Sequence, residues 1–326
     1  MDKREKREVE EALALLDRPP AEIFGADPAK AARVYRRLAR ALHPDTGAGT
    51  AAFTRLAAKW HAYGRGEDAT ATTITTRKRT YEVGPKLARG DLADLFAVTY
   101  GGKRGVLKLP RDSADSDLLE REAAALRKMR ADGDPRFLPY VPELVEPLRY
   151  ENRSGNVIAR LDGFHTLTEV RDAYPDGVDP RDAAWMWRRL LVALGFAHRA
   201  GVLHGAVLPE HVMIHPELHG LVLIDWCYSA DPGGRIPAMV GARASWYPPE
   251  VPGREPASPA TDLFLATRCM THLMGQRAPG PLRAFARGCT LAAQKKRPSD
   301  AWRLLGELDE LLERLYGART FRPFTL

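Results

Sequence analysis

The chain has 326 residues, which is long enough for two domains or for one large domain with an extension. Hydrophobic residues make up 44% of it and charged residues 28%, so the composition indicates neither a membrane protein nor a disordered chain. The formal net charge of +7 leans basic, but no RNA-binding or DNA-binding motif accompanies it, and we expect no specific nucleic-acid partner.

Cysteine usage and the first residues bear on the cellular compartment. Cys227, Cys269 and Cys289 are odd in number and unequally spaced, which argues against a disulfide framework and against a cysteine-based zinc site. The charged start of the chain lacks the apolar core of a signal peptide, and no run approaches the roughly 20 apolar residues of a membrane-spanning helix. We therefore expect a cytoplasmic protein with no membrane partner.

The first seventy residues predict three helices. Apolar residues recur at helical spacing from Val9 to Leu16, and Pro19 and Pro20 end this first run. Asp27 and Pro28 form an N-cap and a first-turn proline for a second helix, which has an apolar face and a basic face. The apolar face of a third helix carries four residues: Phe53, Leu56, Trp60 and Tyr63.

The segment between the second and third helices is His43-Pro44-Asp45, and this arrangement resembles the J domain of DnaJ-type co-chaperones over roughly residues 8–66. The resemblance implies that the tripeptide stimulates ATP hydrolysis by a DnaK-type chaperone. It also implies that the basic face steers that partner electrostatically. The residues of this basic face that we assign to the chaperone-binding site are Arg36, Arg37 and Arg40. The alternative is a helical hairpin in which the tripeptide is only a turn.

A threonine-rich segment, residues 67–80, predicts a linker that runs into a first strand. Residues 81–109 then follow the pattern strand, turn, strand, turn, strand, with Gly90 in the first turn. Lys108 lies late in the third strand, where a buried ammonium group requires a partner. A helix that starts near Ser116 supplies Glu122 as that partner, with Glu120 as the less favoured choice.

Further along, residues 157–163 predict a strand that breaks into a loop containing Asp162, and residues 182–200 predict a long helix buried in the core. Two apolar runs between residues 202 and 229 flank the turn signal 215–220. We expect them to form a hairpin whose polar residues emerge at the rim of a cleft.

The spacing around this hairpin resembles the catalytic loop and the metal-binding segment of protein kinases. In that pattern His204 takes the place of the first histidine and Asp225 the place of the metal-binding aspartate. Ala206 replaces the catalytic aspartate, and His211 replaces the asparagine that is a second magnesium ligand. Further departures are Leu208 in place of a lysine and Trp226-Cys227 in place of Phe-Gly.

The resemblance extends from about residue 81 to 316 and implies an α+β protein. A small helical J-domain hairpin (1–66) and a linker (67–80) precede a bilobal protein kinase-like domain (81–326). The small lobe covers about 81–160 and the large lobe about 161–326. The nucleotide-binding residues implied are Gly90, Lys108, Glu122, Asp162 and Asp225, with ATP and magnesium as cofactors.

Two features qualify the metal site. Asp225 and His211 are expected to face one another across the hairpin, but imidazole suits magnesium poorly because magnesium prefers oxygen ligands. A zinc site built from the hairpin histidines is disfavoured, since no cysteine or glutamate completes a zinc motif. These histidines are His204, His211, His215 and His219.

Three further residues match positions that support the large lobe of this fold. They are Glu250 and Arg297, which the resemblance implies pair with one another, and Asp262, which opens an apolar run.

Because an alanine side chain cannot accept a proton, the sequence predicts a J-domain co-chaperone with a degenerate kinase-fold domain, a pseudokinase. This domain would act as a regulatory or client-binding module for an unknown protein client. One alternative is an unorthodox serine/threonine-type protein kinase, in which Glu210 or His211 substitutes for the missing base. Another is a structural adaptor that binds no nucleotide. A small-molecule phosphotransferase of the same fold is a minor alternative.

Overall fold

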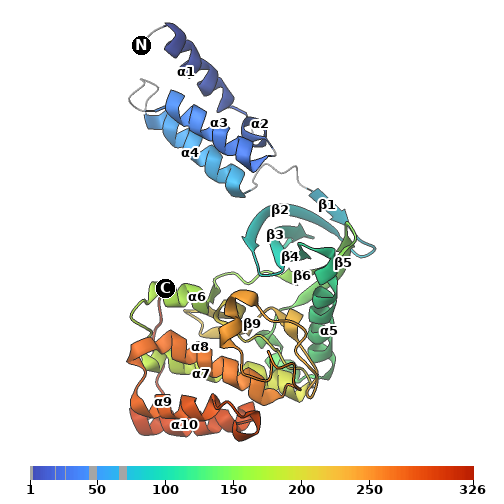
Figure 1. Cartoon of the computed structure of the whole chain (residues 1–326), viewed down its shortest axis with the longest axis vertical. Coiled ribbons are helices and arrows are strands. Elements are labelled where there is room, and N and C mark those ends of the chain that lie inside the picture. Colours follow the sequence, from blue (N-terminus) through green and yellow to red (C-terminus); the bar gives the residue numbers. More distant parts are fainter. Residues whose placement is uncertain (1–2, 19, 26, 44–49, 66–71) are drawn as a thin grey trace. The chain divides into compact units, whose positions relative to one another are not determined.

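The computed structural model describes residues 3–18, 20–25, 27–43, 50–65 and 72–326 (Figure 1). These residues belong to two compact units, Met1–Arg111 and Asp112–Leu326.

The N-terminal unit opens with helices: the sequence predicts three, and within the described residues the structure also has a short one at Pro20–Phe24. The four helices are α1 (Lys3–Leu15), α2 (Pro20–Phe24), α3 (Pro28–Ala41) and α4 (Thr50–Arg65). The carboxylate of Asp27 accepts a hydrogen bond from the backbone N–H of Lys30 at 3.3 Å, which confirms the N-cap of α3. Helices α3 and α4 lie side by side in Figure 1 and contact one another.

An aromatic cluster holds these helices together. The ring of Trp60 stacks on that of Tyr35 with centroids 4.6 Å apart, and it meets the ring of Phe24 edge-on at 5.1 Å. The hydroxyl of Tyr63 donates to the carbonyl of Gly25 at 2.7 Å. Leu38 and Leu56 are fully buried in the same cluster, so the apolar faces predicted for α3 and α4 form one core.

Four strands complete this unit: β1 (Thr72–Thr75), β2 (Thr80–Arg89), β3 (Ala93–Tyr100) and β4 (Lys103–Pro110). Each pairs antiparallel with the next. Strand β1 lies inside the segment predicted as a linker, because Ile74 is buried and pairs with the fully buried Tyr81 of β2. In the turn between β2 and β3, the N–H of Gly90 donates to the carbonyl of Ala93 at 2.8 Å.

The C-terminal unit begins with helix α5 (Ser116–Asp132) and the antiparallel hairpin of β5 (Leu144–Tyr150) and β6 (Arg153–Ala159). A second, small sheet contains β7 (His165–Thr166), β8 (Val212–His215) and β9 (Gly220–Leu223), in the order β7-β8-β9. The hairpin of β8 and β9 pairs His215 with Gly220, so the predicted turn and its two flanking strands are confirmed.

Helices fill the rest of this unit: α6 (Leu167–Ala173), α7 (Pro180–Arg199), α8 (Pro259–Met274), α9 (Gly280–Cys289) and α10 (Ala301–Tyr316). Asp179 caps α7 by accepting from the N–H of Arg181 at 2.9 Å. Helix α7 contacts both α8 and α10, and Figure 1 shows it among them. Its buried residues include Trp187, Leu190, Leu191 and Leu194, which confirms that it is a core helix.

The last residues pack on α6 and α7, an arrangement that the sequence did not predict. The ring of Phe324 stacks on that of Tyr174, with centroids 5.4 Å apart, and the hydroxyl of Tyr174 donates to the carbonyl of Thr325 at 2.6 Å. The guanidinium group of Arg322 lies 2.9 Å from the carboxylate of Asp182 on α7.

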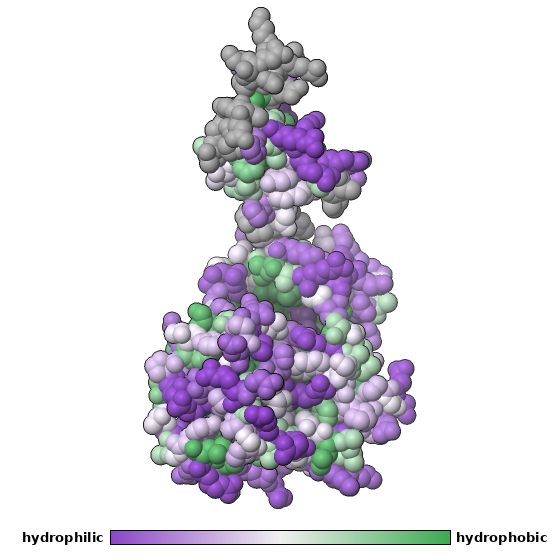
Figure 2. All heavy atoms as spheres, turned by 60° about the vertical axis from the view of Figure 1, so that its left-hand side comes forward, coloured by the Kyte–Doolittle hydropathy of each residue, from purple (hydrophilic) through white to green (hydrophobic). Residues whose placement is uncertain are grey.

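Within the described ranges, no helix combines the length and the apolar character needed to cross a membrane. On the face drawn in Figure 2, hydrophobic residues form small patches separated by hydrophilic ones.

A buried ion pair supports the large-lobe helices, as the sequence predicts. The guanidinium group of Arg297 donates to both carboxylate oxygens of Glu250, at 2.7 and 2.8 Å. Thr261 on α8 adds a hydroxyl donor to the same carboxylate at 2.9 Å. Burial alone would raise the pKa of Glu250, but the hydrogen bonds from Arg297 and Thr261 lower it below its usual value.

Replacing Arg297 with Ala should therefore lower the free energy of unfolding by about 3 to 5 kcal/mol, because it leaves the Glu250 carboxylate buried without its cation. Urea unfolding measures the change. Arg303→Ala is the matched control, since Arg303 pairs with Glu307 on the exposed face of α10 and should cost less than about 1 kcal/mol. Equal losses in the two variants would contradict a supporting role for the buried pair.

Candidate active-site cleft

A buried carboxylate holds the loop that follows α7. Asp262 accepts hydrogen bonds from the backbone N–H groups of His204 and Gly205, both at 2.8 Å, and its other close neighbour is the Nε2 of His198 at 2.8 Å. Gly205 has a φ of +77°, and an added Cβ would come within 2.4 Å of the carbonyl oxygen of Tyr228. The loop therefore requires glycine at this position.

His204 is fully buried below this loop and acts as a structural residue. Its Nδ1 accepts from the N–H of Ala206 at 3.2 Å, and its Nε2 lies 2.8 Å from the carbonyl of Ile224. A neutral ring with its proton on Nε2 satisfies both partners. Burial lowers the pKa of His204 to about 4. The effect of burial outweighs that of the nearby Asp262 carboxylate, which alone would raise the pKa.

Ala206 stands where the resemblance places the catalytic base. Its side chain is fully buried, and its carbonyl accepts from the Nδ1 of His211 at 2.8 Å. A methyl group neither accepts a proton nor binds an acceptor hydroxyl. The loop thus keeps its backbone framework and lacks the group that performs acid-base chemistry.

The two residues considered as substitute bases have other partners. The carboxylate of Glu210 lies 3.0 Å from the guanidinium of Arg243, and Oε1 accepts from its Nε. His211 is buried and uses Nδ1 to bond the carbonyl of Ala206, while its ring stacks near Tyr228. Among the described residues, the second carboxylate oxygen of Glu210, Oε2, has no hydrogen-bond partner, and the Nε2 of His211 faces Asp225.

The hairpin brings His211 and Asp225 together, as the sequence predicts. The backbone N–H of Ile224 donates to the carbonyl of His211 at 2.9 Å, and the Nε2 of His211 lies 3.3 Å from the Oδ2 of Asp225. Asp225 adopts the left-handed conformation with φ of 66°, at the start of a short 3-10 helix, Trp226–Tyr228. Magnesium fits this pair poorly, because an imidazole takes the place of an oxygen ligand.

Glu122 points from α5 into the same region. It is buried, and one of its carboxylate oxygens accepts from the side-chain amide of Asn156 on β6 at 2.9 Å. Glu120, the less favoured partner of Lys108, instead accepts from the hydroxyl of Ser154 at 2.7 Å. Lys108 is buried on β4 of the N-terminal unit, and its pairing with Glu122 stays a prediction.

Two other residues of the predicted nucleotide site have local roles. Gly90 forms the turn between β2 and β3 described above. Asp162 lies in the loop after β6, where its carboxylate is 3.1 Å from the guanidinium of Arg160. Contact of either residue with a nucleotide stays a prediction.

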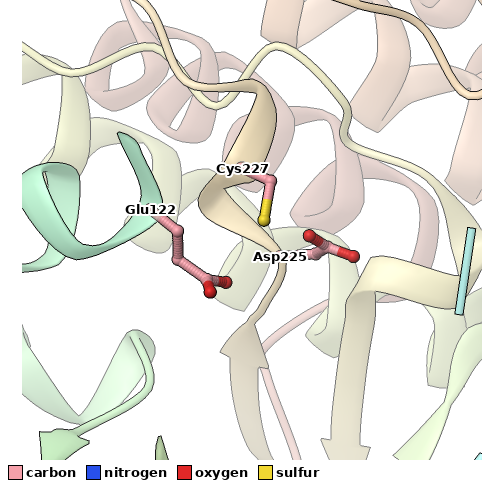
Figure 3. Close-up of side chains that lie close together, drawn as sticks. All are labelled: Glu122, Asp225 and Cys227. Carbon is pink, nitrogen blue, oxygen red and sulfur yellow. The ribbon is translucent and has the colours of Figure 1, made fainter. Parts of the chain in front are cut away.

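Cys227, which the sequence did not assign to the site, lies beside two of its residues. Glu122, Asp225 and Cys227 each present a ligand atom, and these atoms all lie within 4.8 Å of one another. Figure 3 shows the three side chains converging from α5 and from the segment after β9. The sequence alone shows that Cys227 follows Asp225 by two residues. The approach of Cys227 to Glu122 depends on the tertiary fold.

The hairpin histidines do not converge on one another in the same way. The rings of His204 and His211 are 6.2 Å apart, whereas His215 meets Phe164 and His219 stacks on Trp185 at 4.2 Å.

Comparisons with known proteins place the fold. No protein-family profile matches the chain. A stretch of 58 residues is 40% identical to casein kinase II subunit alpha′ of Saccharomyces cerevisiae, and it covers 18% of this chain and 17% of that protein.

Solved structures align over a much larger share. The BubR1 kinase domain aligns with a TM-score of 0.60 at 14% identity, covering 75% of this chain and 83% of that one. The PknI kinase domain of Mycobacterium tuberculosis gives 0.56 at 18% identity, with coverages of 74% and 99%. Vaccinia related kinase 3 gives 0.58 at 15% identity, with coverages of 79% and 97%. The chain therefore has a protein kinase-like fold over about three quarters of its length.

The buried neutral state of His204 predicts a pH dependence of stability. Its pKa is about 4 in the fold and near 6.5 in the unfolded chain, so between these values the unfolded state binds more protons. Stability should be complete above pH 6.5 and should fall toward pH 4, with about 3 kcal/mol of the loss due to His204.

Urea unfolding at pH 7 and at pH 4.5 checks this expectation, with His204→Gln as the comparison. The variant should lose less stability than the parent on acidification. A residual loss is expected from His219 and His272, whose pKa values burial also lowers. An identical pH dependence in parent and variant would show that His204 does not carry the effect.

Proposed function

We propose that the kinase-like domain is a pseudokinase that serves as a regulatory or client-binding module beside a J-domain-like helical region. The observation that carries this proposal is Ala206, a buried methyl group at the position of the catalytic base. The surrounding loop is fully formed by the hydrogen bonds to Asp262, so the missing base reflects the residue itself and not a distorted loop.

Nucleotide binding is part of the proposal. Lys108 and Glu122 are both buried charged residues, and burial of such groups requires partners of opposite charge or strong hydrogen bonds. In the kinase resemblance they position ATP phosphates, and the loop after β6 meets the adenine through its backbone. The donor set at Asp225 suits magnesium poorly, because the imidazole of His211 takes the place of an oxygen ligand.

The second candidate is an unorthodox protein kinase. It is favoured by the persistence of Lys108, Glu122 and Asp225, since phosphoryl transfer depends largely on positioning and electrostatics. Two observations count against it: Ala206 supplies no base, and the guanidinium of Arg243 holds Glu210 through its carboxylate oxygen Oε1.

The J-domain part of the proposal rests on the helical region. Helices α3 and α4 pack through one aromatic core, and the basic residues Arg36, Arg37 and Arg40 are partly or largely exposed on α3. His43 is exposed after α3, and its ring lies 6.0 Å from that of Phe53 on α4. Pro44 and Asp45 lie outside the described residues. The partner that would bind this surface is a DnaK-type chaperone.

The test of catalysis compares the unmodified protein with Asp225→Ala. With labelled ATP, magnesium or manganese, and a generic protein acceptor, the parent should incorporate no more label than the variant, because loss of a general base alone costs about 100-fold to 10,000-fold in rate. Binding of a fluorescent ATP analogue, measured on the same preparation, separates a nucleotide-binding pseudokinase from an adaptor. Robust labelling that depends on Asp225 would establish the kinase instead.

The test of the J-domain region is His43→Gln. This variant should no longer stimulate the steady-state ATPase of a DnaK-type chaperone, while its circular dichroism spectrum stays unchanged because His43 is exposed. His61→Gln is the matched control, since His61 is an exposed histidine on α4. Stimulation that is absent in the parent, or equal in parent and His43→Gln, would remove the co-chaperone role.

A further inference from the structure

The cluster of Glu122, Asp225 and Cys227 has a chemistry that nucleotide binding does not require. Its three ligand atoms lie within 4.8 Å of one another, and all three residues belong to the C-terminal unit. We propose that these side chains bind a divalent transition-metal ion of the zinc class. The proposal goes beyond the proposed function, because such a site needs neither ATP nor the helical region.

The geometry of the cluster is close to that of a three-ligand zinc site. Zinc lies about 2.0 to 2.3 Å from carboxylate oxygen and thiolate sulfur, which places tetrahedral ligand atoms roughly 3.3 to 3.8 Å from one another. The ligand atoms lie within 4.8 Å of one another, so a bound ion would draw the most distant pair together by about 1 Å. Asp225 and Cys227 share the short turn after β9, so both approach Glu122 from one side (Figure 3).

The donor atoms select the class of metal. Magnesium and calcium take oxygen ligands, whereas a cysteine thiolate selects zinc and related softer ions. Two side chains bring softer donor atoms near Asp225: the Nε2 of His211 lies 3.3 Å from its Oδ2, and the Sγ of Cys227 lies within 4.8 Å of its ligand oxygen.

Burial and the neighbouring residues also fit a metal site. Glu122 and Cys227 are buried, while the Asp225 side chain retains 20% exposure, which leaves a route for the ion and for a water molecule in the fourth position. Asn156 fixes the orientation of Glu122 through its 2.9 Å hydrogen bond, as residues around metal ligands commonly do.

The experiment uses the full chain, freed of metal with a chelator and titrated with Co²⁺ in the absence of nucleotide. Cobalt replaces zinc in such sites and reports its ligands by absorption. We expect a thiolate-to-cobalt charge-transfer band in the near ultraviolet that saturates as the site fills. Added Zn²⁺ should then displace the cobalt and abolish the band, whereas added Mg²⁺ should not.

Three variants assign the band. Cys227→Ser should abolish the band. Glu122→Gln keeps the thiolate ligand, so the band should persist, but the affinity for cobalt should fall. Loss of a residue that only hydrogen-bonds to a metal ligand costs roughly 10-fold to 100-fold in affinity, and loss of a ligand should cost at least as much. Cys289→Ser is the matched control, because Cys289 is also a buried thiol and lies on α9, outside the cluster. Circular dichroism checks that each variant is folded.

No cobalt binding, binding without a charge-transfer band, or a band that survives in folded Cys227→Ser would each overturn the metal site. These outcomes are independent of the proposed function, whose tests use labelled ATP and a chaperone ATPase. A protein that binds cobalt through Cys227 and binds no ATP would retain the metal site and lose the nucleotide role.

Discussion

The buried carboxylate of Asp262 is the interaction on which the loop between α7 and β8 depends. It ties the start of α8 to the backbone of His204 and Gly205, and the loop it holds leads directly into β8. Burial alone would raise its pKa, but the contacts from His198 and from the His204 backbone lower it. The Asp262 carboxylate therefore stays charged, and it accepts hydrogen bonds from backbone N–H groups. These hydrogen bonds go to backbone groups, so they do not depend on the side chain at position 206.

Much of the site was predictable from the sequence, because several of its contacts join residues that are close together in the chain. His211 and Asp225 lie on one hairpin, so their approach follows from strand pairing over a short stretch of chain. Helices α3, α4 and α7 follow from their apolar period. The pair of Glu250 and Arg297 was predicted by resemblance alone, because those residues lie far apart in the chain and carry no local signal of pairing.

What the sequence did not predict depends on tertiary packing between distant segments. Cys227 reaches Glu122 only because α5 packs against the turn after β9. Arg243 engages Glu210 across a long irregular segment, and Asn156 holds Glu122 from a strand that periodicity does not relate to α5. The C-terminal residues pack on α6 and α7 through single rings, and such contacts have no repeating pattern for a sequence to show.

The residues around this loop divide into those that hold its backbone and those whose side chains lie near Asp225. Where the kinase resemblance places a catalytic base and a second magnesium ligand, this chain has a methyl group and an imidazole. Glu122 is buried, Asp225 is partly exposed, and the thiol of Cys227 lies beside both carboxylates. Two carboxylates are costly to keep close together in a buried site unless something there stabilises their charge. The two carboxylates therefore depend on the groups packed around them, such as the Asn156 amide that bonds Glu122 and the His211 ring beside Asp225.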